Sequence, residues 1–156
     1  MTTALETLDR AYQQMMQAFV RRGQALHYTE LARDLGLTPE AGRGVLLDLM
    51  DTGVPAWLYD GTDYVASFAP FNNVPTQYRI SVEGHQRSFA QCGFEALAVC
   101  WLFPGKDVTI EAPCLDCGEA LRVVVREGRI VSAEPPTIYA FVDIPFREWR
   151  PNLAYS

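Results

Sequence analysis

The groups best suited to chemistry in this 156-residue chain are its four cysteines, which all lie between positions 92 and 117. Cys114 and Cys117 form a C-x-x-C pair, and Cys92 and Cys100 precede them. In the cytoplasm, clustered thiols are more often metal ligands, redox groups or nucleophiles than structural disulfides. The cysteines therefore predict a site that binds a metal ion, attacks a substrate or packs in the core, and their surroundings must distinguish these uses.

Cys92 has the surroundings that best suit a reactive thiol. It lies near the start of a predicted helix over residues 88–102, where backbone N–H groups and the helix dipole favour a thiolate. Glu95 follows at i+3, so both side chains share one face. A thiol that binds a soft centre beside an acid that moves a proton suits catalysis. The alternative is a buried cysteine with a solvated glutamate, and the spacing alone leaves both open.

The C-x-x-C pair is predicted to form a turn between two strands, which is the shape of a zinc knuckle. A closed tetrahedral zinc site needs four ligands, and neither histidine of the chain has ligand spacing. Cys92 and Cys100 are separated by about 12 Å along a helix, so we do not expect both to bind one ion. Cys100 has apolar neighbours and is predicted to be a small core residue.

The N-terminal part of the chain predicts helices. Apolar residues recur at helical spacing over about residues 3–22, and Gly23 ends this helix. Two shorter helices are predicted to begin at Thr29 and Thr38. A hairpin over residues 56–68 should follow. Three helices and a hairpin in this order predict a winged-helix-like lobe.

The remainder predicts strands around one central helix. The apolar segment 88–102 is predicted to be that helix. Alternating apolar residues place the expected strands at residues 77–84, 107–113, 120–128, 129–135 and 137–144. The predicted fold class is therefore α+β, with a winged-helix-like domain at residues 1–70 followed by a domain at residues 71–156 in which a small sheet packs on the central helix.

Composition narrows the expected partners. The net charge of −6 disfavours nucleic acid, because affinity for it rests on basic residues, and Arg43 is the one expected base reader on the predicted recognition helix. We therefore interpret the winged-helix lobe as structural. No apolar run approaches the roughly 20 residues that a membrane-spanning helix needs. The N-terminal sequence is polar and acidic, unlike a signal peptide, so we expect a cytoplasmic protein with no membrane partner.

Three stretches together resemble the organomercurial (alkylmercury) lyases: NNVPTQYRIS, QRSFAQCGFEALAV and DVTIEAPCLDCGEALRV. In that family the central helix carries an aromatic residue, a cysteine and then an aspartate, and this pattern matches Phe89, Cys92 and Glu95. A further family cysteine, about twenty residues on, matches Cys114. The resemblance covers roughly residues 25–146 and implies a winged-helix-like N-terminal part followed by a β-rich catalytic part.

The resemblance also implies an activity. In the family, two thiolates capture the mercury of R–Hg⁺, and a carboxylic acid delivers a proton to the carbon, which releases R–H and leaves thiolate-bound Hg²⁺. Mercury is soft and prefers thiolate ligands. The resemblance implies Cys92 as the metal-binding thiolate and Glu95 as the proton donor. It leaves Cys114 and Cys117 as further metal ligands or as a structural knuckle, and it implies no resident cofactor.

Two features depart from the family pattern. Glu95 is one methylene longer than the aspartate of the family. The second essential cysteine of the family would fall at residues 145–149, but the local sequence, IPFREWRP, contains none. The chain also ends at Ser156, where the family continues, so the resemblance is to a divergent and C-terminally short member.

Two other classes of function are compatible with the sequence. The first is a non-catalytic thiol module that binds Zn²⁺, Cu⁺ or Hg²⁺. The second is a winged-helix regulator that responds to metal or redox state. The expected small partner is an organometal or a soft metal ion, and a homodimer is compatible with the sequence.

Overall fold

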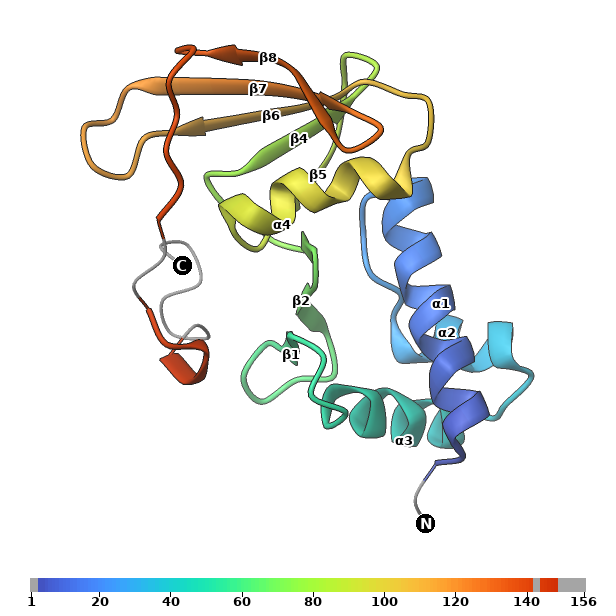
Figure 1. The fold of residues 1–156 in the computed structure, drawn as a ribbon. Helices are drawn as coiled ribbons and strands as arrows, with labels where there is room; N and C mark the ends of the chain where they lie inside the picture. The colour runs from blue at the N-terminus through green and yellow to red at the C-terminus, as the bar shows by residue number, and fades with distance from the viewer. Residues whose placement is uncertain (1–2, 142–143, 149–156) are drawn as a thin grey trace. The chain divides into compact units, whose positions relative to one another are not determined.

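The computed structural model describes residues 3–141 and 144–148, and it has an α+β fold in which N-terminal helices precede an antiparallel sheet (Figure 1). The chain divides into two compact units between Ala69 and Pro70. The first unit contains α1 (Leu5–Arg22), α2 (Tyr28–Leu35), α3 (Pro39–Met50) and a hairpin of β1 (Ala56–Leu58) and β2 (Val65–Phe68). The three N-terminal helices and the hairpin expected from the sequence are thus present.

The core of the first unit lies between α1 and β2. Met15 and Phe19 on α1 are fully buried, as is Phe68 on β2. The Phe68 ring centroid lies 6.5 Å from that of Phe19 and 5.4 Å from that of Tyr12. Because burying one such side chain contributes about 1.5–3 kcal/mol, this aromatic cluster anchors the hairpin to the first helix. Gly23, in the left-handed conformation with φ 73°, ends α1 as the sequence predicted.

The start of α2 differs from the sequence prediction. We expected Thr29 to be the N-cap, but His27 has that position. The His27 ring accepts a hydrogen bond from the Thr29 backbone N–H, and the Glu30 carboxylate accepts one from the His27 backbone N–H. This reciprocal arrangement is a capping box, and it uses a residue that cap preferences rank below threonine.

A glycine permits the close approach of α2 and α3. A Cβ on Gly42 would lie 2.3 Å from the Ala32 Cβ and 2.9 Å from the Tyr28 carbonyl oxygen. We predict that Gly42→Ala lowers the free energy of unfolding by about 1–3 kcal/mol, because the two helices must move apart. Urea denaturation followed by circular dichroism measures this loss.

Gly44 is the matched control for that prediction, since it lies on the same helix and a Cβ there meets no atom within 4 Å. Gly44→Ala should raise the free energy of unfolding by about 0.5–1 kcal/mol through helix propensity. Equal changes in the free energy of unfolding for the two substitutions would show that the close α2–α3 contact at Gly42 does not restrict the size of the side chain there.

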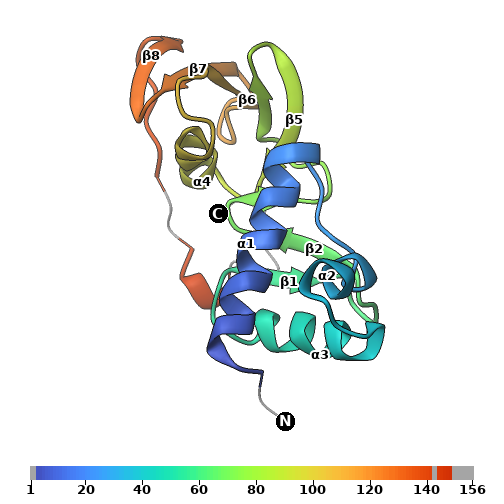
Figure 2. The ribbon, with the colours of Figure 1, turned by 90° about the vertical axis from the view of Figure 1, so that its right-hand side faces the viewer.

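The second unit is built on an antiparallel sheet with strand order β3-β5-β4-β6-β7-β8. After β5 the chain forms a short helix, α4, which continues as the 3₁₀ helix η1. Figure 1 shows α4 lying along one face of the sheet, and Figure 2 shows it end-on. The elements of this unit are β3 (Phe71–Asn72), β4 (Arg79–Val82), β5 (His85–Ala90), α4 (Gly93–Ala98), η1 (Val99–Leu102), β6 (Val108–Pro113), β7 (Ala120–Arg126), β8 (Arg129–Glu134) and η2 (Phe146–Glu148).

Two hairpins of this sheet turn on Glu-Gly pairs. Glu83 and Gly84 have φ of 51° and 78° between β4 and β5, and Glu127 and Gly128 have φ of 49° and 74° between β7 and β8. Two consecutive residues with positive φ are typical of the type I′ turn, whose twist matches that of the flanking strands. These turns fix the register of the strands on either side.

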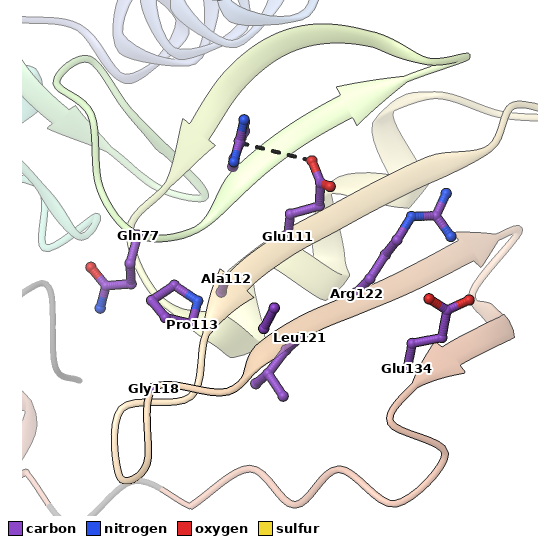
Figure 3. A pocket seen from close by; sticks show the side chains of 10 residues that line it. Gln77, Glu111, Ala112, Pro113, Gly118, Leu121, Arg122 and Glu134 are labelled. Carbon is purple, nitrogen blue, oxygen red and sulfur yellow. Dashed lines mark ion pairs between the residues drawn. The ribbon is translucent and has the colours of Figure 1, made fainter.

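Charges alternate in sign across four strands on one face of the sheet. The register places Arg79 opposite Glu111, Glu111 opposite Arg122, and Arg122 opposite Glu134. Arg79 and Glu111 form an ion pair of 3.8 Å, and these side chains line a cavity of about 390 Å³ (Figure 3). Opposite charges on facing strands stabilise the pairing. No described cysteine or histidine lines this cavity, although Pro113 and Gly118 in its wall are next in sequence to Cys114 and Cys117.

One helix prediction and one strand prediction need correction. The segment 88–102 is not one helix, because Ser88–Ala90 belong to β5 and the helix begins at Gly93. Ser88 and Ala90 are buried while Phe89 between them is less so, which is the period of a strand. Residues 137–141 of the predicted strand at 137–144 have no regular structure, and residues 142–143 lie outside the described ones.

No helix within residues 3–141 and 144–148 is long and apolar enough to cross a membrane.

Candidate functional site

Cys92 lies at the junction between β5 and α4. Its backbone is extended, with φ −146° and ψ 174°, and its carbonyl accepts the first helical hydrogen bond, 2.9 Å from the Ala96 nitrogen. The Cys92 side chain makes no cap hydrogen bond, but the nearby backbone N–H groups of Glu95 and Phe94 act to lower the pKa of its thiol. Cys92 is thus the N-cap residue of α4, and the residue is only 1% exposed.

Burial determines the protonation state of this thiol. It raises the pKa of Cys92 to about 11 from an ordinary value of 9.0, and the two N–H donors offset only part of that increase. The sequence predicted that the helix start would favour the thiolate, and this prediction was wrong because desolvation of the charged sulfur outweighs the local N–H groups. Cys92 is therefore a protonated thiol at neutral pH.

Glu95 shares this enclosed site with Cys92. Burial raises the pKa of Glu95 to about 7, although a hydrogen bond from the Cys92 thiol to the carboxylate acts in the opposite direction. Its Oε2 is buried and has no hydrogen-bond partner among the residues that the structure describes. At neutral pH the acid and the carboxylate are both well populated, as a proton donor needs.

The raised pKa of Glu95 predicts how stability depends on pH. The folded pKa of about 7 lies above the ordinary 4.5, so folding favours the protonated acid. The contribution of this group to stability is fully present below about pH 4.5 and is lost as pH rises through about 7. The wild type should lose stability between pH 4 and pH 8 as Glu95 ionises, whereas glutamine does not titrate. We therefore predict that the change in unfolding free energy caused by Glu95→Gln is about 2–3 kcal/mol more favourable at pH 8 than at pH 4.

Chemical denaturation of wild type and Glu95→Gln at both pH values measures this difference. A matched control is Glu119→Gln, because Glu119 is exposed. If Glu95→Gln had the same effect at pH 4 and pH 8, the carboxyl group would not be held in its protonated form.

An apolar cavity of about 380 Å³ adjoins the start of α4. Tyr78 forms part of its wall, with ring carbon Cε1 3.4 Å from where a Cβ on Gly93 would lie. Burial, followed by the nearby Cys92 sulfur, raises the pKa of the Tyr78 phenol, so Tyr78 lines the cavity and is close to Cys92. The apolar lining includes Phe94, Leu97, Ile110, Leu121, Val123 and Phe141.

The C-x-x-C pair occupies the turn between β6 and β7. Cys114 is half-buried and lines the apolar cavity, and Cys117 is exposed. The backbone N–H groups of Cys117 and Asp116 donate to the Cys114 sulfur, and the Cys117 thiol also reaches it; these contacts lower the pKa of Cys114. Cys114 is thus the thiol of the chain whose surroundings favour a thiolate, which the sequence attributed to Cys92.

The binding of one metal ion by Cys92, Cys114 and Cys117 stays a prediction. Within residues 3–141 and 144–148, no group of three His, Cys, Asp or Glu side chains converges to hold a metal ion. Cys92 and Glu95 lie together, and Cys114 and Cys117 lie together. Cys100 is 1% exposed, and its predicted place in the core is confirmed.

The sequence model of the alkylmercury lyase (MerB) family matches residues 71–155, which is more than half of the chain and includes all four cysteines. The chain belongs to the alkylmercury lyase family. The resemblance found in the sequence is therefore confirmed for the part of the chain that contains α4 and the sheet.

Individual alkylmercury lyases match over a shorter stretch. Those of Bacillus cereus and Clostridium butyricum are each 36% identical to this chain over 75 residues. The aligned stretch is 46% of this chain and 32% of each relative, so the chain spans about a third of the length of the curated relatives that it matches.

The fold extends further than the sequence match. The crystal structure of the mercury-bound form of MerB2 superposes with a TM-score of 0.65 at 20% identity and covers 85% of this chain and 61% of that one. At this identity the likeness shows a shared fold. Since the superposition covers more of the chain than the family match does, the shared fold includes part of the N-terminal unit.

Sequence reasoning about the alkylmercury lyase pattern missed Tyr78 and the cavity beside it. Tyr78 lies in the quoted stretch NNVPTQYRIS, but nothing in its spacing connects it to Cys92. The connection arises because β4 pairs with β5, so that the Ala90 backbone N–H donates to the Tyr78 carbonyl at 3.0 Å, two residues before Cys92. In the region 145–149, where the late cysteine of the family would fall, Trp149 lies outside the described residues.

Proposed function

We propose that this member of the alkylmercury lyase family cleaves carbon–mercury bonds by protonolysis, with Cys92 as the mercury-binding thiolate and Glu95 as the proton donor. The observation that supports this proposal is the half-buried Glu95 carboxyl group beside the buried Cys92 thiol, with a pKa of about 7 and an Oε2 atom that is itself buried. Soft mercury prefers sulfur over nitrogen and oxygen ligands, so it binds Cys92 rather than the carboxylate.

The first step exchanges the thiol proton for mercury. Cys92–SH reacts with R–Hg–X to give Cys92–S–Hg–R and HX, and no atom changes oxidation state. The pKa of about 11 makes the free thiolate scarce at neutral pH. Burial then favours the product, because a neutral S–Hg bond replaces a charge that the site solvates poorly.

The second step transfers the Glu95 proton to carbon. The electron pair of the C–Hg bond takes that proton, R–H leaves, and the remaining Hg²⁺ is held by the Cys92 thiolate beside the newly formed Glu95 carboxylate. An acid with a pKa near the operating pH is the most effective general acid, because a large fraction of it is protonated and it still transfers its proton readily. The pKa of about 7 for Glu95 meets that requirement.

The apolar cavity provides a place for the organic group. It adjoins α4 through Gly93 and Phe94, which follow Cys92 directly. We propose that the group R of R–Hg occupies this cavity, with Tyr78 moving aside to admit mercury to Cys92. Tyr78 is the wall residue whose phenol responds to the charge on Cys92.

We also propose that residues 1–70 form a winged-helix-like lobe with a structural role. The supporting observation is α1, α2 and α3 followed by the β1–β2 hairpin. Arg43, the one expected base reader, is instead in an ion pair of 2.8 Å with Asp63 in the hairpin turn. An exposed pair of this kind is worth little energy, but it directs the guanidinium toward the hairpin.

Incubation of the purified chain with phenylmercury and excess monothiol, followed by gas chromatography of the headspace, tests the proposed activity. Catalytic release of benzene is the expected result. Stoichiometric mercury uptake with no benzene would contradict the lyase and favour the non-catalytic thiol module. That alternative has one observation in its favour, which is the C-x-x-C turn with N–H groups aimed at the Cys114 sulfur.

A further inference from the structure

We infer that Cys114 and Cys117 form a two-coordinate dithiolate site of their own, which takes Hg²⁺ from Cys92 after cleavage and presents it to solvent. The source of the ion rests on the proposed function, but the ability of the pair to bind Hg²⁺ does not. The site is distinct from the Cys92–Glu95 pair, because Cys92 does not line the cavity whereas Cys114 does.

The turn between β6 and β7 holds the two sulfurs together. The Cys114 nitrogen donates to the Glu119 carbonyl at 2.7 Å, and the Gly118 nitrogen donates to the Cys114 carbonyl at 2.9 Å. Gly118 has φ 76°, a conformation that glycine adopts without strain. The Cys117 thiol lies within hydrogen-bond reach of the Cys114 sulfur. Little rearrangement is therefore needed for both sulfurs to bind one ion.

The surroundings of the pair favour an ion that accepts two ligands. Among the described residues, no third His, Cys, Asp or Glu side chain completes a cluster with them, so the four ligands of a structural zinc site are not assembled. Hg²⁺ is soft and forms stable complexes with two thiolates, and Cu⁺ shares this preference. The absence of further ligands thus selects for a soft d¹⁰ cation over zinc.

The position of the pair suits transfer from the inside of the site to the outside. Cys114 forms part of the same cavity wall as Gly93 and Phe94, the residues that follow Cys92. Cys117, on the other side of the turn, is exposed. An ion that leaves Cys92 through the cavity meets Cys114 first and reaches solvent with Cys117 as its second ligand.

The transfer balances without an oxidant or reductant. Cys92–S–Hg⁺ reacts with Cys114–SH and Cys117–SH to give Cys114–S–Hg–S–Cys117, Cys92–SH and one H⁺. Mercury remains Hg²⁺ throughout. The released proton is taken by the Glu95 carboxylate, so the transfer restores both the thiol and the acid for the next substrate.

Titration with Hg²⁺ in a Cys92→Ser, Cys100→Ala background tests the site without any need for cleavage. This chain keeps only the two thiols of the turn. We expect it to bind one Hg²⁺ per chain, seen by the ultraviolet charge-transfer band of the Hg–thiolate bonds, and to retain it against glutathione. Adding Cys117→Ser should weaken that retention roughly a hundredfold, because the second thiolate then comes from solution rather than from the same turn.

Retention that is unchanged by Cys117→Ser would overturn the inference, as would a lack of Hg²⁺ binding in the Cys92→Ser, Cys100→Ala chain that circular dichroism shows to be folded. If only the proposed function fails, the result is different: the Cys92→Ser, Cys100→Ala variant binds Hg²⁺, but the wild type releases no benzene from phenylmercury. With limiting glutathione, the wild type should release a second equivalent of benzene, and Cys117→Ser should stop after the first.

Discussion

Cys92→Ser should lower the rate of benzene release from phenylmercury by more than about a thousandfold, the scale of loss when the sole covalent nucleophile is removed. Serine occupies nearly the same volume, but its oxygen is a poor ligand for a soft cation. Although Cys92 is buried, serine leaves no large cavity there, and circular dichroism of the variant checks that the fold is intact. Single-turnover gas chromatography at saturating phenylmercury measures the effect on cleavage rather than on binding.

Cys100→Ala is the matched control, since Cys100 is equally buried and lies on η1, directly after α4. This variant should cleave phenylmercury at close to the wild-type rate. A similar loss in both variants would indicate that a general disturbance of the core, and not the loss of one thiolate, had stopped the reaction.

Glu95→Gln should lower the single-turnover rate by about 10²–10⁴-fold, the contribution of a positioned general acid. The amide has the shape of the acid but has no proton to give to carbon. Mercury binding by Cys92 should persist, so intact R–Hg accumulates on the chain. The variant therefore separates capture of the substrate from cleavage.

The pH dependence of the wild type follows from the same group. Once R–Hg is bound to Cys92, cleavage needs Glu95 in its acid form, so the single-turnover rate should be maximal below pH 7 and fall as pH rises through about 7. Glu95→Gln should lose this limb, and Glu95→Asp should keep it with a shifted midpoint. A wild-type rate that rises through pH 7 would exclude Glu95 as the acid.

Much of the fold could be predicted from the sequence because local signals there agree with the final structure. The apolar spacing of α1, the glycine at its end and the turn between β1 and β2 all determine structure over short distances. The strands β6, β7 and β8 were also expected, since each alternates and is bounded by turn residues. Family membership followed from the same region, in which Phe89, Cys92 and Glu95 recur at the family spacing.

The remainder depended on contacts that no local pattern encodes. Small apolar residues at 88–90 suit a strand as well as a helix, and the pairing of β5 with β4 decides between them. The protonation of Cys92 depends on burial by the whole unit, which outweighs the helix start. The cavity is closed partly by residues 138–141, a segment without regular structure that the sequence had predicted to be a strand.

Several expectations from the sequence stay predictions. The domain boundaries at residues 1–70 and 71–156, the cytoplasmic location and the absence of a nucleic-acid partner are among them. The shared metal site of Cys92, Cys114 and Cys117 is also untested, and the dithiolate inferred above is a more specific alternative to it. Nothing in the structure or the comparisons supports the homodimer.

Intact-protein mass spectrometry, combined with headspace analysis, tests the central claim most directly. Wild type and Glu95→Gln are each loaded with one equivalent of phenylmercury at pH 6.5 in D₂O. The wild type should release monodeuterated benzene and retain Hg²⁺, whereas Glu95→Gln should retain the phenylmercury adduct and release almost no benzene. Equal release of monodeuterated benzene from the two chains would contradict the assignment of Glu95 as the group that protonates the carbon.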